Sequence, residues 1–265
     1  MQNKGFDCAT PLTAELAAAF AADGYTFVGR YLVPARYSKS LTRAEAELIS
    51  AAGLSIVSVF ETTADRALGG YNAGLADGKA ALACAAEVGQ PAGSTIYFAV
   101  DFDAQPWQMP KVIDYLHGCA LGAQGYVPGV YGSYAVVEAV RAAGVCQRYW
   151  QTYAWSRGKV AEDIHIYQWE NDVLENDIKI DRNEGYGDCG SWPVKQEENM
   201  PKLPVNIADN IIDTYLSKTW FDCEEQRQLA EQEGRAEDAA AWEQMRDWQH
   251  TLADELRKAS GQLVE

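Results

Sequence analysis

The chain has 265 residues, of which 48% are hydrophobic and 23% are charged, and its formal net charge is −16. This length permits one large α/β domain or a smaller domain with an appendage, and the composition is that of a globular protein rather than a disordered one. Such an acidic surface repels phosphate backbones, so we expect no nucleic-acid partner. No apolar run approaches the roughly 20 residues that span a bilayer, so we expect no membrane partner either.

Strand-like apolar runs alternate with helical patterns through the first part of the chain. Thr10 followed by Pro11 predicts a helix start, and Thr42 with Glu45 three residues later has the spacing of a capping box. Longer helices are predicted over 72–88, 108–122 and 134–143. The predicted strands are 4–9, 26–32, 54–60, 96–103, 126–131, 148–153, 164–169 and 177–181. Repeated βα units specify a parallel sheet, so we predict a compact TIM-type (β/α)8 barrel, with an open doubly wound sheet as the competing architecture.

The character of the sequence changes after residue 190. Prolines predict a linker over 191–205, and the remaining residues, 206–265, have an acidic and helical pattern. Apolar residues at helical spacing form a stripe, which consists of Trp242, Met245, Trp248, Leu252 and Leu256. We therefore predict a barrel domain over 1–190 followed by an acidic helical tail, which is a helical hairpin. This tail either replaces a missing barrel helix or offers a surface to a protein partner.

Polar and aromatic side chains gather at the predicted carboxyl ends of the strands. The fourth strand is apolar and stops on Asp101 and Asp103, which point the same way if the backbone stays extended. Repulsion between two such acids raises one pKa and so suits an acid and a base. The candidate catalytic residues are Asp7, Glu61, Asp101, Asp103 and Asp181, and the candidate substrate-binding residues are Arg30, Tyr31, Tyr131, Gln168 and Trp169.

Carboxylates beside aromatic rings suit carbohydrate chemistry, because acids protonate a glycosidic oxygen and flat rings stack on sugar faces. Serine–histidine chemistry fits poorly, since the chain has 3 histidines and no nucleophile elbow. We predict no metal and no cofactor, although a carboxylate cluster can also hold Mg²⁺ or Ca²⁺. Arg30 has an alternative role as an ion-pair partner of the acid pair.

Short segments at the strand ends form a recognisable set. Gly5-Phe6-Asp7, the acid pair of the fourth strand, Pro128-Gly129-Val130-Tyr131, Tyr167-Gln168-Trp169 and Asp181-Arg182-Asn183 resemble the family 25 lysozymes, which are N-acetylmuramidases. Gly5-Phe6-Asp7, Val28-Gly29-Arg30-Tyr31, Val59-Phe60-Glu61 and Tyr97 to Asp103 resemble still more a related glycoside-hydrolase-like TIM-barrel domain family of uncertain function. The resemblance preserves their order over residues 4–190 and does not extend to the tail.

The resemblance implies that Asp7, Asp101, Asp103 and Asp181 lie on an active rim. In the lysozymes the position of Asp103 holds a glutamate that acts as general acid. Aspartate is one methylene shorter, which withdraws the carboxyl by roughly 1–1.5 Å, and a displacement of about 1 Å costs on the order of 100-fold in rate. Glu61, on the neighbouring strand, is the alternative acid.

The leading hypothesis is a glycoside hydrolase-like protein that cleaves a bacterial cell-wall polysaccharide such as peptidoglycan. The alternatives are a barrel that binds carbohydrate with little or no hydrolysis, and a protein-interaction module that uses tail residues 206–265. The visible N-terminus shows no signal-peptide pattern. For a wall-active protein this predicts delivery by a non-classical route, such as phage lysis or a secretion machine.

Overall fold

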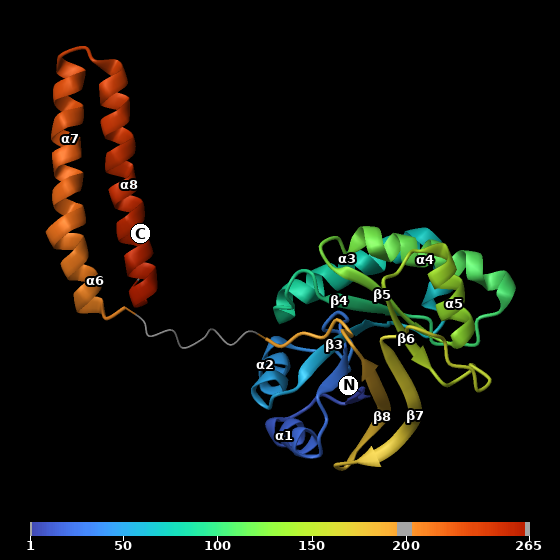
Figure 1. Cartoon of the computed structure of the whole chain (residues 1–265). Coiled ribbons are helices and arrows are strands. Elements are labelled where there is room, and N and C mark those ends of the chain that lie inside the picture. The colour runs from blue at the N-terminus through green and yellow to red at the C-terminus, as the bar shows by residue number, and fades with distance from the viewer. Residues whose placement is uncertain (1, 195–202, 263–265) are drawn as a thin grey trace. The chain divides into compact units, whose positions relative to one another are not determined.

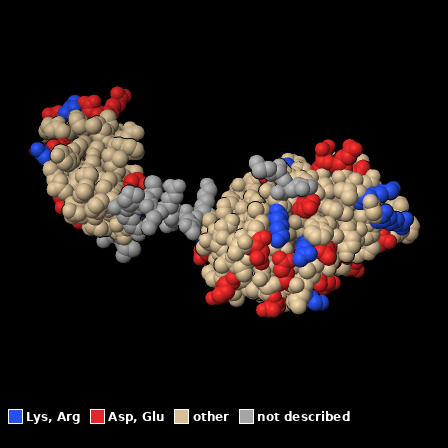
Figure 2. Space-filling view, turned by 60° about the horizontal axis from the view of Figure 1, so that its bottom comes forward, with Lys and Arg blue, Asp and Glu red and all other residues tan. Residues whose placement is uncertain are grey.

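The computed structural model describes residues 2–194 and 203–262. The chain divides into two compact units, Met1–Lys195 and Gln196–Glu265. Figure 2 shows acidic and basic side chains interspersed on the visible face of the first unit. The boundaries that we predict at 190 and 205 stay predictions, because residues 195–202 of the predicted linker lie outside the described residues. No helix in the described part of the chain is long and apolar enough to cross a membrane.

The first unit is a closed barrel in which each strand pairs with its neighbours in chain order (Figure 1). This confirms the predicted TIM-type barrel. The strands are β1 (Gln2–Asp7), β2 (Phe27–Tyr31), β3 (Ser55–Phe60), β4 (Thr95–Ala99), β5 (Val127–Gly132), β6 (Arg148–Thr152), β7 (Ile166–Glu175) and β8 (Ile178–Tyr186).

The last strand departs from a regular (β/α)8 barrel, because β8 runs antiparallel to both β7 and β1. A two-residue turn joins β7 to β8, and both of its residues, Asn176 and Asp177, have positive φ angles of 48° and 63°. This is the backbone that a tight hairpin requires. Asp181 pairs with Asp7 near the start of β8, so it reaches the carboxyl-end rim because the strand direction is reversed.

Helices cover only part of the barrel wall. The barrel helices are α1 (Ala14–Ala22), α2 (Arg43–Ala51), α3 (Gly70–Val88), α4 (Met109–Gly122) and α5 (Tyr134–Ala143), with short 3₁₀ turns at η1 (Arg66–Gly69) and η2 (Pro106–Gln108). No helix lies between β6 and β7 or between β7 and β8. In Figure 1 the yellow wall of β7 and β8 accordingly has no helix over it.

The helix starts confirm half of one prediction and correct another. Thr42 caps α2 by accepting a hydrogen bond from the Glu45 amide at 3.2 Å, but the Glu45 side chain bonds to Leu12 and Arg30 instead of closing the capping box. The first helix begins later than predicted, and its cap is Thr13 rather than Thr10. The reason is local: the backbone N–H of Leu12 donates to the Glu45 carboxylate at 2.8 Å, which ties the chain to α2 before α1 begins.

Aromatic rings fill the barrel interior and fix the position of the rim above it. Trp150 on β6 is fully buried, and its ring meets Tyr97 and Tyr131 edge-on at centroid distances of 5.7 and 5.2 Å. These edge-to-face contacts are the favoured geometry for aromatic pairs. The strands that carry the rim residues are therefore held by a rigid packed core.

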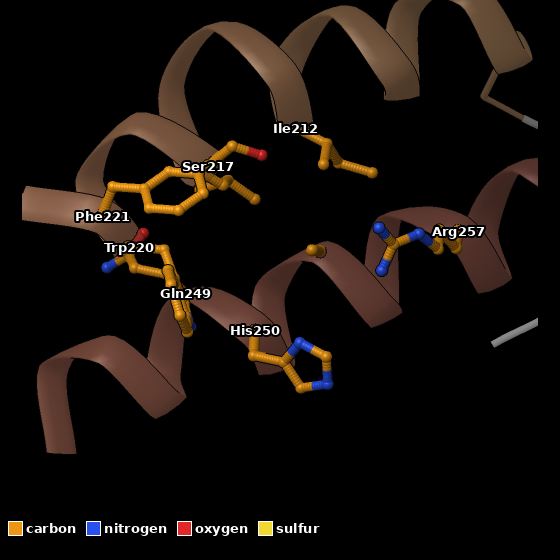
Figure 3. Close-up of a pocket in the computed structure, with 9 residues that line it drawn as sticks. Ile212, Ser217, Trp220, Phe221, Gln249, His250 and Arg257 are labelled. Atoms are coloured by element: carbon orange, nitrogen blue, oxygen red, sulfur yellow. The ribbon is translucent and has the colours of Figure 1, made fainter. Parts of the chain in front are cut away.

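The second unit is a helical hairpin, as predicted. It consists of α6 (Val205–Ile211), a π-helical turn (Ile212–Leu216), α7 (Ser217–Gln232) and α8 (Ala236–Ser260). An ion pair joins the long helices, with Arg246 of α8 lying 2.8 Å from Glu224 of α7. Figure 3 shows a groove between these helices, of about 210 Å³, with Trp220 on one side and His250 on the other.

Candidate active site

The rim of the barrel encloses a cavity of about 120 Å³. It brings together most of the residues predicted from the strand ends, which come from β1, β2, β5, β7, β8 and the segments that follow β3 and β4. The predicted residues that line it are Asp7, Tyr31, Glu61, Asp101, Tyr131, Gln168 and Asp181. Four of its lining residues are carboxylates, so the cavity concentrates negative charge and hydrogen-bond acceptors.

A hydrogen-bond network centred on Gln168 positions the acids on β1 and β8. The Gln168 side-chain amide donates to Asp7 Oδ2 at 2.9 Å and to Asp181 Oδ2 at 3.1 Å. Its own carbonyl oxygen accepts from the Tyr131 hydroxyl at 2.8 Å. Asn183 adds a second bond to Asp7 Oδ2 at 2.7 Å. Since both donors to Asp7 are neutral amides, they hold its carboxyl in place without neutralising its charge.

Burial and mutual repulsion make these carboxyls weaker acids than usual. Burial and then the charge of Asp181 raise the pKa of Asp7 to about 7. Burial and then the charge of Glu61 raise the pKa of Asp101 to about 6, and burial also raises the pKa of Asp181. Desolvation disfavours the charged form of any carboxyl. Asp7 and Asp101 therefore take up and release protons closer to neutral pH than an ordinary carboxyl does.

Lys39 is the cation of this site, and sequence reasoning missed it. Its ammonium lies 3.2 Å from Glu61 Oε1 and 3.9 Å from the centroid of the Tyr31 ring. Its positive charge lowers the pKa of Asp101, against the larger effects of burial and Glu61. Lys39 lies in the loop between β2 and α2, and no motif in that loop marks it.

Two further residues also escaped prediction: Trp150, which lines the cavity, and Asn183, which is not part of the lining and for which a sequence signal existed. Asn183 lies two residues after Asp181 on β8 and therefore faces the same side. Its side-chain carbonyl accepts a hydrogen bond from the Trp150 indole at 2.8 Å. Trp150 thus links the packed core to the network that holds Asp7.

Arg30 does not reach the cavity. Its side chain is fully buried on the outer side of β2, where its guanidinium lies 2.7 Å from Glu45 of α2 and also donates to the carbonyl of Cys8. Neighbouring residues of a strand face opposite sides, so Tyr31 enters the cavity and Arg30 cannot. Arg30 is a structural residue that ties β2 to α2, rather than the partner of the Asp101 and Asp103 pair.

Asp103 and Trp169 also lie away from the cavity lining. The fourth strand ends at Ala99 and the chain bends at Phe102, so the extended alternation that would align Asp103 with Asp101 is absent. Asp103 is exposed. Trp169 is the neighbour of Gln168 on β7 and lines a different cavity, on the outside of the barrel.

Among the described residues, no group of three or more histidine, cysteine, aspartate or glutamate side chains is arranged to hold a metal ion. What this cavity offers is a protonated carboxyl, charged carboxylates and aromatic walls in one enclosed space. Those are the groups that acid–base chemistry on a sugar requires.

The fold and the acid-lined cavity define a glycoside hydrolase-like barrel. A family model described as "Rv2525c-like, glycoside hydrolase-like domain" matches residues 18–201. The match spans more than half of the chain, and the chain belongs to this family. The hallmark segments from Val28 to Asn183 lie within the matched residues, and Gly5-Phe6-Asp7 precedes them.

A curated relative is the uncharacterized protein YbfG of Bacillus subtilis (strain 168), which is 37% identical over 123 residues. That match covers 41% of this chain and 16% of YbfG, so the chain corresponds to a small part of its relative. The Tat-secreted protein Rv2525c of Mycobacterium tuberculosis, crystallised in complex with L-tartrate, has a TM-score of 0.63 and 24% identity, covering 72% of this chain and 98% of that one.

The modular autolysin LytC of Streptococcus pneumoniae has a TM-score of 0.51 and 10% identity, covering 70% of this chain and 47% of that protein. At these identities the likeness of both solved structures to this chain is one of fold.

Proposed function

We propose that the barrel hydrolyses a glycosidic bond in a bacterial cell-wall polysaccharide, with Asp101 as the general acid. The observation that carries this proposal is the cavity itself. In it, the Asp101 carboxyl, with a pKa of about 6, lies among other carboxylates at the carboxyl-end rim of the barrel. A general acid works best when its pKa is close to the working pH. Peptidoglycan is the polymer to test, because LytC, which shares the fold, was solved in complex with a synthetic peptidoglycan ligand.

In this mechanism Asp101 donates its proton to the leaving glycosidic oxygen as the bond to the anomeric carbon breaks. The ionised carboxylate of Asp181 stabilises the positive charge that develops on the sugar ring, and a water attacks the anomeric carbon and gives its proton to a carboxylate. Asp7, held by two amides, orients the sugar or the water. Glu61 is less suited to be the acid, since it is ion-paired with Lys39.

The test is the release of reducing ends from purified peptidoglycan by the full chain. Asp101→Asn should lower the initial rate by on the order of 100-fold or more, because a general acid contributes about 10²–10⁴-fold. Asp103→Asn is the matched control, since it makes the same chemical change at an exposed residue outside the cavity, and it should retain the rate within about twofold. Equal losses in both variants would remove the assignment to Asp101.

A second candidate function is carbohydrate binding without efficient turnover. The observation that favours it is the absence of Asp103 from the cavity lining, which leaves the strand-four acid pair unassembled. Isothermal titration with soluble muropeptides separates the two functions. Binding that Asp7→Ala abolishes, with no reducing ends released by wild-type protein, would support this candidate over the hydrolase.

A protein-interaction role for the helical tail, residues 206–265, stays a prediction. Phe221 and Trp248 of the hairpin are 67% and 58% exposed, which is unusual for side chains of this size. Deleting residues 203–265 should abolish capture of a protein partner and leave carbohydrate binding by the barrel intact. Loss of carbohydrate binding upon that deletion would contradict this division of roles.

A further inference from the structure

The barrel wall formed by β1, β7 and β8 carries a second cavity, separate from the acid-lined one. It has a volume of about 280 Å³ and lies beside β7 and β8, over which no helix lies (Figure 1), whereas β1 packs on α1 through Phe6 and Phe20. Its lining side chains include Lys4, Tyr25, Trp169, Arg182 and Glu184. In a barrel with a helix after every strand such a surface would be packed against a helix. Here the Trp169 ring is left accessible, while Tyr25 is buried.

The two aromatic rings of this outer-wall cavity are fixed by their neighbours. The Lys4 ammonium lies 3.8 Å from the centroid of the Tyr25 ring, and the Tyr25 hydroxyl donates to Glu175 at 3.0 Å. The Arg182 guanidinium lies 5.8 Å from the centroid of the Trp169 ring. The Trp169 side chain is 41% exposed, so part of this ring stays open to a ligand.

Carboxylates at this wall outnumber cations. Arg182 forms ion pairs with Glu170 at 2.9 Å and with Glu175 at 2.7 Å, and Lys4 donates to the backbone carbonyl of Asp23 at 3.0 Å, which leaves the lysine charge in place. With Glu184 there are three carboxylates against two cations, so the wall carries no excess of positive charge that would attract a phosphate or a polyanion. It offers a ligand a flat ring and fixed polar groups, and this combination suits a neutral, hydroxyl-rich molecule.

The strand that carries Trp169 also carries the network of the acid-lined cavity. Gln168 points into the barrel and bonds to Asp7, while the next residue, Trp169, faces the outer wall. Likewise Asn183 bonds to Asp7 inside the barrel, and its neighbour Arg182 lies on the outer wall. A ligand on the outer wall therefore binds the outer faces of the strands that hold the acids.

From these observations we infer that the outer-wall cavity is a second carbohydrate site, which holds a saccharide unit of a polysaccharide against the Trp169 ring. The inference rests on the proposed function in one respect, which is the choice of a cell-wall polysaccharide as the ligand. Attachment of an insoluble polymer at a second site raises the effective concentration of its other segments at the acid-lined cavity. The outer-wall site thus strengthens binding of the polymer, whereas hydrolysis takes place in the acid-lined cavity.

The test is binding of the full chain to insoluble peptidoglycan, measured as the protein left in solution after sedimentation. Trp169→Ala should weaken binding about tenfold, since an aromatic contact contributes area burial together with specific stacking. Trp169→Phe, which keeps a flat ring, should recover part of the loss. Trp248→Ala is the matched control, because it removes another exposed tryptophan, 58% exposed, from the second unit, and it should bind as wild type does.

These binding results test the outer-wall site independently of whether the protein hydrolyses peptidoglycan. Unchanged binding by Trp169→Ala, an equal loss in Trp248→Ala, or no binding by the wild type would overturn the outer-wall site even if reducing ends are released. Loss of binding in Trp169→Ala alone would support it even if the wild type releases none. A dimer of the wild type that Trp169→Ala dissociates would assign this wall to a second copy of the chain and also overturn the inference.

Discussion

Replacing Asp7 with asparagine should stabilise the protein above neutral pH. Asp7 is 7% exposed, and both of its hydrogen bonds from Gln168 and Asn183 fall on one oxygen, Oδ2. An asparagine whose carbonyl oxygen takes that place keeps both bonds and removes the buried charge. The variant therefore separates the cost of the charge from the benefit of the network.

The size of the stability gain follows from the pKa of Asp7. Burial and the charge of Asp181 raise this pKa to about 7 from the ordinary value of 3.8. The folded protein therefore binds more protons than the unfolded chain between about pH 4 and pH 7, and its stability falls as the pH rises through this window. At roughly 1.4 kcal/mol per pKa unit the full cost at pH 8 is about 4 kcal/mol. Because Asp7 titrates together with Asp181, we expect a gain of about 2 kcal/mol in the asparagine variant.

The assay is urea unfolding of the wild type and of Asp7→Asn from pH 4 to pH 8, followed by tryptophan fluorescence. The two proteins should have similar stability at pH 4, and the variant should become the more stable one as the pH rises, while its hydrolytic rate falls. This is the trade-off expected when function uses a destabilising group. If the variant is equally destabilised at every pH, Asp7 is an ordinary stabilising acceptor and the reasoning is refuted.

Three further predictions follow from individual contacts. Glu61→Gln removes the charge that raises the pKa of Asp101, so the carboxyl of Asp101 should titrate at lower pH in ¹³C NMR; an unchanged or raised pKa would contradict the coupling. Arg30→Met leaves the Glu45 carboxylate buried without its ion-pair partner, which should cost about 3–5 kcal/mol of stability in urea unfolding; a change in affinity for polysaccharide without a loss of stability would return Arg30 to the binding site. Gly74→Ala places a methyl group against the backbone where α3 packs on α4, so thermal unfolding should occur several degrees lower; an unchanged midpoint would show that the helices separate at little cost.

The sequence predicted the barrel because its strand signals are continuous apolar runs. It also predicted the positions of the acids in outline, since strand ends of a barrel converge on one rim. It could not predict the direction of β8, because the decisive signal is two residues long. Asn176 and Asp177 suit a tight hairpin turn, and they lie within a segment whose apolar residues fit either strand direction.

Two of the predicted binding residues, Arg30 and Trp169, face away from the cavity for the same reason. Alternation along a strand assigns Tyr31 and Arg30 to opposite faces, and Gln168 and Trp169 likewise. A prediction that gathers every polar residue at a strand end must therefore place some on the wrong side. Asp103 fails for a different reason: β4 ends at Ala99, and alternation carries no information beyond the end of a strand.

The central claim is that Asp101 supplies the proton for cleavage of a wall polysaccharide. The measurement that tests it most directly is the ratio of initial rates of reducing-end release from peptidoglycan by Asp103→Asn and Asp101→Asn at pH 6. If Asp101 is the general acid, the Asp103→Asn rate should exceed the Asp101→Asn rate by a factor on the order of 100 or more and should lie close to the wild-type rate. A ratio near one, with measurable release by both variants, would contradict it.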